Sequence, residues 1–256
     1  MTYKIMEMSW TEFERRRKET NTVIVPTGAV EVYGPHLPMG TDCIVAEAIS
    51  RLVAERTGAL IAPMIELGES TGLIGFPGTL ALSKEIFHQA IDGLFTELIR
   101  SGFKNCLFIT GHAGNVNSIS YLCRKYQREK GVLCGQVDWW RFASANSGDI
   151  FEMKGHMAHG HASECGTSVM LYLSPNLVRM EDAARVEPAP AHISYPDIVR
   201  YVPLETKTPS GIVGDATLGS AEKGRKIIEK CVDRIVEYMS FEFGGKTENI
   251  EEEWKS

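Results

Sequence analysis

The chain has 256 residues, of which 43% are hydrophobic and 23% are charged, a composition typical of a globular protein with a sizeable core. Its formal net charge is -6, from 27 basic and 33 acidic residues. Neither sign gathers into a long run, which argues against nucleic acid as a partner, and no apolar run approaches the roughly 18 residues of a membrane span. We therefore expect one domain over residues 1–256, with no nucleic-acid or membrane partner.

The start of the chain and its cysteines indicate a compartment. The N-terminal stretch lacks the apolar core and the small-residue cleavage site of a signal peptide. The six cysteines are widely spaced and form no C-x-x-C pair, so a zinc ribbon is not indicated. We expect reduced thiols in a cytoplasmic protein.

Short apolar runs alternate with amphipathic segments along the chain. The predicted strands are residues 22–28, 58–68, 105–110 and 132–140. The predicted helices are residues 43–58, 82–103, 116–131, 165–173 and 219–239. This alternation predicts a three-layer α/β/α fold, in which helices cover both faces of a mostly parallel central sheet.

Two local patterns and two irregular stretches accompany these elements. Asp42 is suited to cap the helix that follows it, and Ser83 is suited to cap the helix over 82–103. Residues 140–160 and 185–219 lack periodicity and are expected to form long loops, the second of which covers the active site or makes a subunit contact. The expected buried stripe of the helix over 82–103 consists of Ile86, Ala90, Leu94 and Leu98.

Polar side chains of metal-binding type follow three of the predicted strands. Because ligands of an open α/β sheet bind at the carboxyl ends of its strands, these positions are the first candidates for a site. Structural explanations compete with this one, since His36 can brace its loop and His112 can be a hydrogen-bonded turn residue. Glu31 is harder to explain in that way, because a buried carboxylate needs a charge partner. The candidates are Glu31, His36, Asp42, His112, His156, His159, His161 and Glu164.

Other catalytic motifs are missing from the sequence. It contains no G-x-S-x-G, no G-x-x-x-x-G-K-[ST] and no G-x-G-x-x-G, which argues against a serine hydrolase elbow and against nucleotide binding. Cys165 lies near His161 and is either a nucleophile or a buried thiol at the start of a helix.

Five blocks of the sequence resemble the creatininase superfamily. The first is VPTGAVEVYGPHLPMGTD at residues 25–42, and GFPGTLAL, FITGHAGN, GHASECGTSVML and GIVGDATLGSAEKG follow in the family's order over nearly the whole chain. The resemblance implies a single α/β domain, metal-dependent hydrolysis and assembly into homo-oligomers, hexamers among them. Members of the superfamily act as creatinine amidohydrolases, as formamide deformylases, as precursor-peptide peptidases and as hydrolases that open a diketo-inositol ring at a C–C bond.

The same resemblance implies a ligand set. The His that helps to hold a second ion in two-metal members is Tyr33 here, and the acids used at that site are replaced by Gly114 and Gly166. Since a neutral phenol is a poorer ligand than an imidazole, we expect one divalent ion rather than two, and Zn, Mn and Fe are all compatible with it. The ligands implied for that ion are Glu31, Asp42 and His112.

Further roles follow from the chemistry that such an ion supports. An ion with open coordination positions activates water and polarises a carbonyl group. We expect His161 to act as general acid and Glu164 to act as base or to position water, with His36 in the same catalytic set. Trp139 and its neighbour, at a strand end, are expected to point to different sides, so that one is in the core. Extra metal or substrate contacts are expected from Tyr33, Thr79, Trp140 and His159.

Four functions are compatible with this sequence. The first is a metal-dependent amidohydrolase that cleaves a non-peptide C–N bond next to a carbonyl in a small polar, cyclic substrate. The second is a C–C hydrolase that acts on a cyclic diketone such as 3-dehydro-scyllo-inosose in inositol catabolism, for which one ion suffices. The third is a precursor-peptide peptidase. The fourth is a non-catalytic binding protein, against which the intact first metal site argues.

Overall fold

Four parallel strands form the central sheet of the protein, whose computed structural model describes residues 2–187 and 202–244. Thr27 pairs with Thr110, and Thr110 pairs with Asp138, so the carboxyl ends of three strands lie in one row. The loops that leave this row carry the candidate site residues. In the spatial order β2-β1-β3-β4, the strands are β2 (Leu60–Ile61), β1 (Thr22–Thr27), β3 (Asn105–Thr110) and β4 (Leu133–Asp138).

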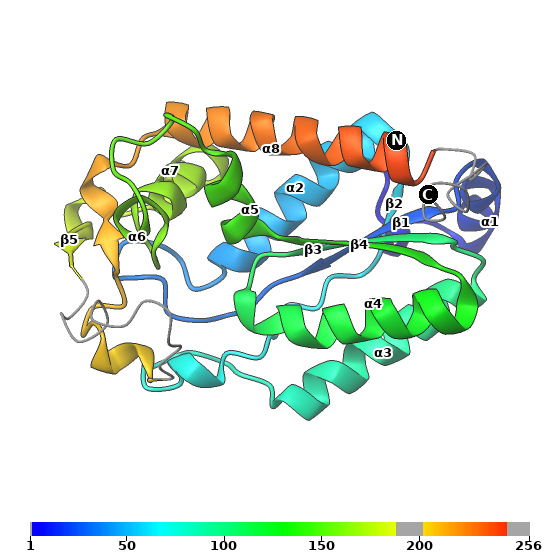
Figure 1. Cartoon of the computed structure of the whole chain (residues 1–256), viewed down its shortest axis with the longest axis horizontal. Coiled ribbons are helices and arrows are strands. Elements are labelled where there is room, and N and C mark those ends of the chain that lie inside the picture. The colour runs from blue at the N-terminus through cyan, green and yellow to red at the C-terminus, as the bar shows by residue number, and fades with distance from the viewer. Residues whose placement is uncertain (1, 188–201, 245–256) are drawn as a thin grey trace, which may run out of the picture.

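Helices cover both faces of the sheet (Figure 1). Along β1, Ile24 belongs to the core on one face, while Val23 and Val25 belong to the core on the other. The three-layer α/β/α fold with a mostly parallel sheet is therefore confirmed. The first core is formed with α2 (Thr41–Thr57), α7 (Glu164–Leu173) and α8 (Ala221–Glu242), and the second with α3 (Lys84–Arg100) and α4 (Val116–Lys130).

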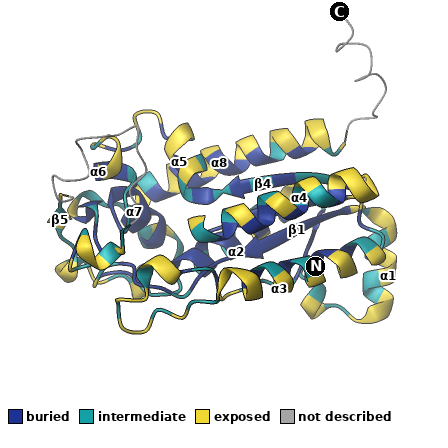
Figure 2. Ribbon diagram, turned by 60° about the horizontal axis from the view of Figure 1, so that its bottom comes forward, coloured by how far each residue is buried: buried dark blue, intermediate teal, exposed yellow. Residues whose placement is uncertain are grey.

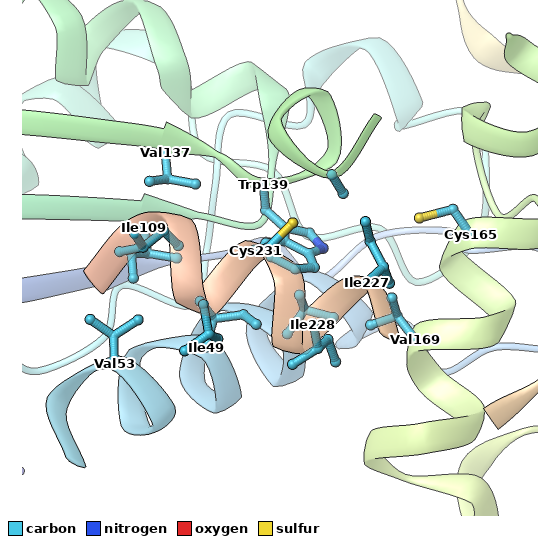
Figure 3. Close-up of a cluster of buried hydrophobic side chains, with 14 of the residues drawn as sticks. Ile49, Val53, Ile109, Val137, Trp139, Cys165, Val169, Ile227, Ile228 and Cys231 are labelled. Atoms are coloured by element: carbon cyan, nitrogen blue, oxygen red, sulfur yellow. The ribbon is translucent and has the colours of Figure 1, made fainter. Parts of the chain in front are cut away.

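The larger core ties α7 to the rest of the molecule. Ile49 of α2, Val169 of α7 and Ile228 of α8 are all buried in it, together with Trp139 (Figure 3). The helices turn their exposed faces outward, as Figure 2 shows. Because α7 is packed against α8 and α2, the segment just before it, which carries His161, is held in place beside the metal ligands.

Two expected helix details differ from the structure. Helix α2 begins at Thr41, and Gly40 occupies the N-cap position, so Asp42 lies in the first turn and is not the cap. Ser83 does cap α3, because its side chain accepts a hydrogen bond from the Ile86 backbone N–H. The buried stripe of α3 is rotated by one residue from the predicted one, since the aromatic side chains bury the most area there. The stripe consists of Phe87, Ile91, Phe95 and Leu98.

The predicted loop over 140–160 is wrong, because much of it is helical. Strand β4 ends at Asp138, and both tryptophans belong to helix α5 (Trp139–Asn146), the first at its start. They point in different directions because neighbouring helical residues are turned by about 100°. Trp139 is fully buried and Trp140 is partly exposed, so the expectation of one core tryptophan holds although its strand-end reason does not.

Three further segments differ from their predictions. The strand expected over 58–68 is reduced to β2 and an isolated bridge between Thr27 and Ile65. The segment 185–219 contains short elements, and its residues 188–201 lie outside the described part of the chain. A helix near the start, α1, was not expected from the sequence. None of the described helices is both long enough and apolar enough to cross a membrane.

The remaining elements are short. They are η1 (Ile5–Glu7), α1 (Trp10–Glu19), η2 (Thr71–Leu73), η3 (Ala113–Asn115), α5 (Trp139–Asn146), α6 (His156–His159), η4 (Pro175–Leu177), η5 (Met180–Asp182), β5 (Arg185–Val186), η7 (Leu204–Thr206), β6 (Gly214–Asp215) and η8 (Ala216–Leu218).

Candidate metal centre

Three buried side chains converge at the carboxyl ends of β1 and β3. Glu31 comes from the loop after β1, Asp42 from the first turn of α2, and His112 from the turn after β3. His112 Nδ1 lies 3.1 Å from Glu31 Oε2 and 3.3 Å from Asp42 Oδ2. One atom from each residue falls within 4.8 Å of the others, a grouping that can hold a metal ion.

Close backbone packing brings these ligands together. The turn after β3 passes directly over the first turn of α2, where a side chain at Gly111 would overlap the Asp42 carbonyl oxygen. Only glycine allows this approach. The spacing between β3 and α2 therefore sets the distance between Asp42 and His112.

Each ligand has a second partner that fixes its orientation. His112 Nε2 donates to the Glu69 carbonyl oxygen at 2.9 Å, which leaves Nδ1 as the coordinating atom once its proton is lost. Ser70 Oγ donates to Glu31 Oε2 at 2.6 Å. Trp140 Nε1 donates to Asp42 Oδ1 at 3.0 Å. These hydrogen bonds hold the three ligands in one geometry, so the site is preorganised for a metal ion.

The protonation of the three ligands fits a cation at their centre. Burial opposes the charge on Glu31, but the imidazoles of His112 and His161 outweigh it and lower the pKa of this carboxyl. Burial and the neighbouring Glu31 raise the pKa of Asp42 to about 6. Burial disfavours a charged His112, yet the two carboxylates raise its pKa well above the usual value. The proton of His112 therefore occupies the place between the two carboxylates that a divalent ion would take. Such an ion would neutralise both carboxylates.

His161 faces this centre with a free nitrogen. Its Nδ1 donates to the Gly211 carbonyl oxygen at 2.6 Å, which orients the ring. Its Nε2 lies 3.8 Å from Glu31 Oε1 and has no hydrogen-bond partner among the described residues. This nitrogen can accept or donate a proton at the metal centre, or act as a further ligand.

Tyr33, which the family resemblance aligns with a second-ion His, lines the same cavity as the three ligands. Its ring stacks at a tilt on His161, with 4.6 Å between ring centroids, and lies 5.8 Å from the Trp140 ring. Burial, followed by the Asp42 and Glu31 carboxylates, raises the pKa of its phenol well above the usual value, so the group stays neutral. A Cβ atom built on Gly166 would lie 3.5 Å from Tyr33 Cε1, so a longer acid at 166 and this ring would compete for space.

The structure does not bring Glu164 or His36 to the cavity. The Glu164 carboxylate is fully buried, accepts backbone N–H groups of Glu152 and Met153 at 3.0 Å each, and pairs with Lys223 at 2.6 Å. His36 Nε2 bonds with Thr167 Oγ1 at 2.9 Å, and burial lowers its pKa to about 4. The structure thus places both side chains in buried contacts that join neighbouring segments, away from the cavity where the sequence predicted their catalytic roles.

His159, Thr79 and Cys165 also lie elsewhere. His159 contacts Ser147 Oγ at 3.2 Å and packs at a right angle to the Phe151 ring, and it is not among the residues that line the cavity. Thr79 Oγ1 accepts the Val32 backbone N–H at 3.2 Å, which braces the metal-binding loop without reaching the cavity. Cys165 is buried in the core, and burial raises its thiol pKa, so it is no nucleophile.

A cavity of ≈ 380 Å³ opens onto the metal centre, a size suited to a small molecule. Two partners of the ligands, Ser70 and the Glu69 carbonyl, and the wall residue Lys207 were missed by sequence reasoning. Only the position of Ser70 and Glu69 just after a predicted strand could have pointed to them. The cavity is lined by Glu31, Tyr33, Asp42, Glu69, Gly72, Leu73, His112, Ala113, Gly114, Trp140, His161, Val202, Leu204 and Lys207.

Comparison with known proteins assigns the chain to a protein family. The family model described as Creatininase: Creatinine amidohydrolase matches residues 6–239. The chain belongs to the creatininase family. Its relatives include the creatinine amidohydrolase of Pseudomonas putida, 31% identical over 93% of this chain and 96% of that protein. A mycofactocin precursor peptide peptidase of Mycobacterium ulcerans (strain Agy99) is 30% identical over 85% of each chain. The 3-dehydro-scyllo-inosose hydrolase of Thermotoga maritima is 26% identical over 89% of this chain and 79% of that protein.

Solved structures of creatininases share the fold and carry metal. A crystal structure of creatinine amidohydrolase has a TM-score of 0.82 at 28% identity and covers 96% of this chain and 99% of its own. A manganese creatininase also scores 0.82, at 27% identity, covering 96% of this chain and 100% of its own. A creatininase mutant described as Zn-Zn type scores 0.80 at 28% identity with the same coverage. This member of the creatininase family is a metal-dependent hydrolase, and its Glu31, Asp42 and His112 fit such an ion in donor type, burial and convergence.

Proposed function

We propose that this creatininase-family enzyme is an amidohydrolase that opens a small polar, cyclic compound at a non-peptide C–N bond beside a carbonyl. The observation that carries the proposal is the convergence of three metal ligands and the free Nε2 of His161 on one cavity of ≈ 380 Å³. The relative named creatinine amidohydrolase supports a C–N bond as the target.

The residues divide the work of such a reaction. The ion, when bound by Glu31, Asp42 and His112, supplies Lewis-acid activation of water and of the carbonyl group. His161 holds its ring by donating Nδ1–H to Gly211, so Nε2 is the atom that passes a proton to the leaving nitrogen. Tyr33 and Trp140 form an aromatic wall that orients a ring substrate and limits the entry of bulk water.

We infer that the centre holds one ion rather than two. The support is the pair of Tyr33 and Gly166, because the ring fills space that an acid at 166 would use and its neutral phenol is a poor ligand. Carboxylate and imidazole donors suit Zn, Mn and Fe alike.

A C–C hydrolase is the second candidate function. The relative named 3-dehydro-scyllo-inosose hydrolase supports it, as does a single ion, which suffices to stabilise an enediolate leaving group. The precursor-peptide peptidase is a third candidate, supported by the relative of that name.

Metal analysis followed by a substrate panel tests the proposal. We expect purified wild-type protein to retain about one ion per chain by plasma mass spectrometry, and Glu31→Gln to lose it because a neutral amide is a weak ligand. Glu66→Gln, which changes an exposed carboxylate in the segment after β2, is the matched control and should keep the ion. A wild-type chain that binds no divalent metal would contradict the proposal.

The panel then separates the candidate reactions. Creatinine, hydantoin and 5-oxoproline represent cyclic amides, cyclohexane-1,3-dione represents cyclic diketones, and a synthetic peptide represents peptidase substrates. Metal-dependent opening of a cyclic amide supports the leading proposal. If the dione is opened and no cyclic amide is, the result supports the C–C hydrolase in place of the amidohydrolase. If only the peptide is cleaved, the result supports the peptidase.

A further inference from the structure

One wall of the cavity is formed by residues 202–207, and it contributes a cationic side chain to the cavity that also holds the metal ligands. Val202, Leu204 and Lys207 all line the cavity that contains the metal ligands. Among the described lining residues, Lys207 is the only lysine or arginine. A cationic side chain cannot serve as a ligand of a metal cation, so Lys207 must have a different role in this cavity.

The turn that carries Lys207 is held by several hydrogen bonds and by a buried threonine. The Lys207 backbone N–H donates to the Leu204 carbonyl oxygen at 2.8 Å, and the Thr208 N–H donates to the same oxygen at 3.0 Å. Thr206 Oγ1 donates to the Pro203 carbonyl oxygen at 2.7 Å, and the Thr208 side chain is fully buried. Short helix η7 contacts η2, and the two lie side by side at the end of the molecule that holds the cavity (Figure 1). The fold therefore fixes the position from which the Lys207 side chain extends.

The ammonium group of Lys207 lacks an acidic partner in the described part of the chain. Lys207 is half-buried, yet no carboxylate described in the structure lies within 4.0 Å of its Nζ. Each of the described acids that line the cavity already accepts a hydrogen bond, Glu31 from Ser70, Asp42 from Trp140 and Glu69 from Thr71. A half-buried cation beside apolar Leu73 and Leu204 gains most from an anion that enters the cavity.

We propose that Lys207 binds a carboxylate group of the substrate while the scissile bond of the same molecule lies at the metal centre. This inference rests on the proposed function and narrows its substrate class to small cyclic amides that carry an acidic group a few atoms from the bond cleaved. With an ion bound, Glu31 and Asp42 are neutralised, so the cavity no longer repels an anion. Lys207 then acts in substrate selection and takes no part in proton transfer.

Matched anion pairs test this inference on the metal-loaded protein. Succinate and succinamate differ only in one carboxylate that becomes an amide, and glutarate and glutaramate form a longer pair. In each, the remaining carboxylate binds the ion and the other end reaches along the cavity. We expect the diacid of at least one pair to bind about tenfold more tightly than its half-amide by calorimetry, as one charge-assisted hydrogen bond predicts.

Three variants decide whether Lys207 causes the preference. Lys207→Met should reduce the diacid preference to near unity, while Lys207→Arg should keep most of it. Lys226→Met changes an exposed lysine of α8 and should leave it unchanged. Equal affinities within both pairs in the wild-type protein, or a preference that survives Lys207→Met, would overturn the inference.

The metal content of the same samples separates the two proposals. A wild-type protein without metal contradicts the proposed function. A metal-loaded protein without a diacid preference contradicts only the assignment of Lys207. Lys207→Met with wild-type metal content shows that the centre is intact, so that a lost preference is not a folding defect.

Discussion

At the scale of single residues, Tyr33 bears on how many ions the proposed centre holds. The phenol is buried, neutral and stacked on His161, and its ring lies against Gly166. The two glycines that stand where acids were sought differ in their surroundings. A side chain at Gly114 would overlap the Glu69 carbonyl oxygen and crowd His112, whereas one at Gly166 has ordinary van der Waals room.

We therefore predict that the double substitution Tyr33→His and Gly166→Glu raises the metal content toward two ions per chain, from about one in the wild type. The smaller imidazole frees the space that the new carboxylate needs. Plasma mass spectrometry after dialysis measures the content. Tyr33→His with Gly114→Glu is the matched control and should lower it, because the acid at 114 displaces His112. Unchanged content in the first double variant would count against the spatial argument.

The metal ligands were predictable from the sequence, but their partners were not. The strand-end pattern placed Glu31, Asp42 and His112 among eight candidates, and the family resemblance selected these three as the ligands. Ser70 and the carbonyl oxygens of Glu69 and Gly211 act through positions that only the folded chain brings near. The carbonyl groups carry no residue-type signal at all.

At the scale of elements, Glu164 shows that a residue predicted to follow a strand end need not line the cavity. It follows His161 by three positions, but it opens helix α7 and its carboxylate points away from the cavity. There it joins the segment at 152–153 to α8 through Lys223, a residue 59 positions away. The carboxylate thus fastens the irregular turn between α5 and α6 to α8.

We predict that Lys223→Met lowers the free energy of unfolding by about 3 kcal/mol, because it leaves a fully buried carboxylate without its cation. Denaturant unfolding in the presence of a chelator measures this change. Adding Glu164→Gln should restore part of the loss, and Lys226→Met, an exposed control, should cost little. Metal content should stay at the wild-type level in each variant. A loss of metal in Lys223→Met would instead tie Glu164 to the centre.

The strands and most helices were predictable because their periodicity is local. Most elements match a predicted segment to within a few residues, namely β1, β3, β4, α2, α3, α4, α7 and α8. The exceptions are β2, which is shorter than predicted, and the two tryptophans, which begin α5 and do not end β4. The missed helix α1 has few apolar positions and is built from charged residues, so its period is weak. The rotated stripe of α3 depends on which side chains bury the most area, and that is decided by packing.

At the scale of the whole molecule, the metal-free protein keeps two acids and one imidazole buried together. An ion that binds only the folded state stabilises it by about 2.7 kcal/mol at a hundredfold excess over its Kd. Because Asp42 has a pKa of about 6 and His112 a raised pKa, both bind protons that the ion must displace. Acid therefore weakens ion binding.

We predict that adding Zn or Mn to chelator-treated protein raises the Tm by about 5–10 °C at pH 7.5 and by clearly less at pH 5.5. Differential scanning fluorimetry at both pH values measures the shifts. Glu31→Gln should show little shift at either pH. Equal shifts at the two pH values in the wild type would contradict the proton competition.

The order in which the site residues occur along the chain has a consequence for how the enzyme matures. Glu31, Asp42 and His112, together with the three longer strands that align them, lie within the first 138 residues. His161, its carbonyl partner Gly211 and the wall residue Lys207 all come later in synthesis. The emerging chain therefore carries all three residues of the proposed metal site before it carries His161, the proton carrier of the proposed reaction. A chain arrested before residue 161 has the proposed ion ligands without that proton carrier.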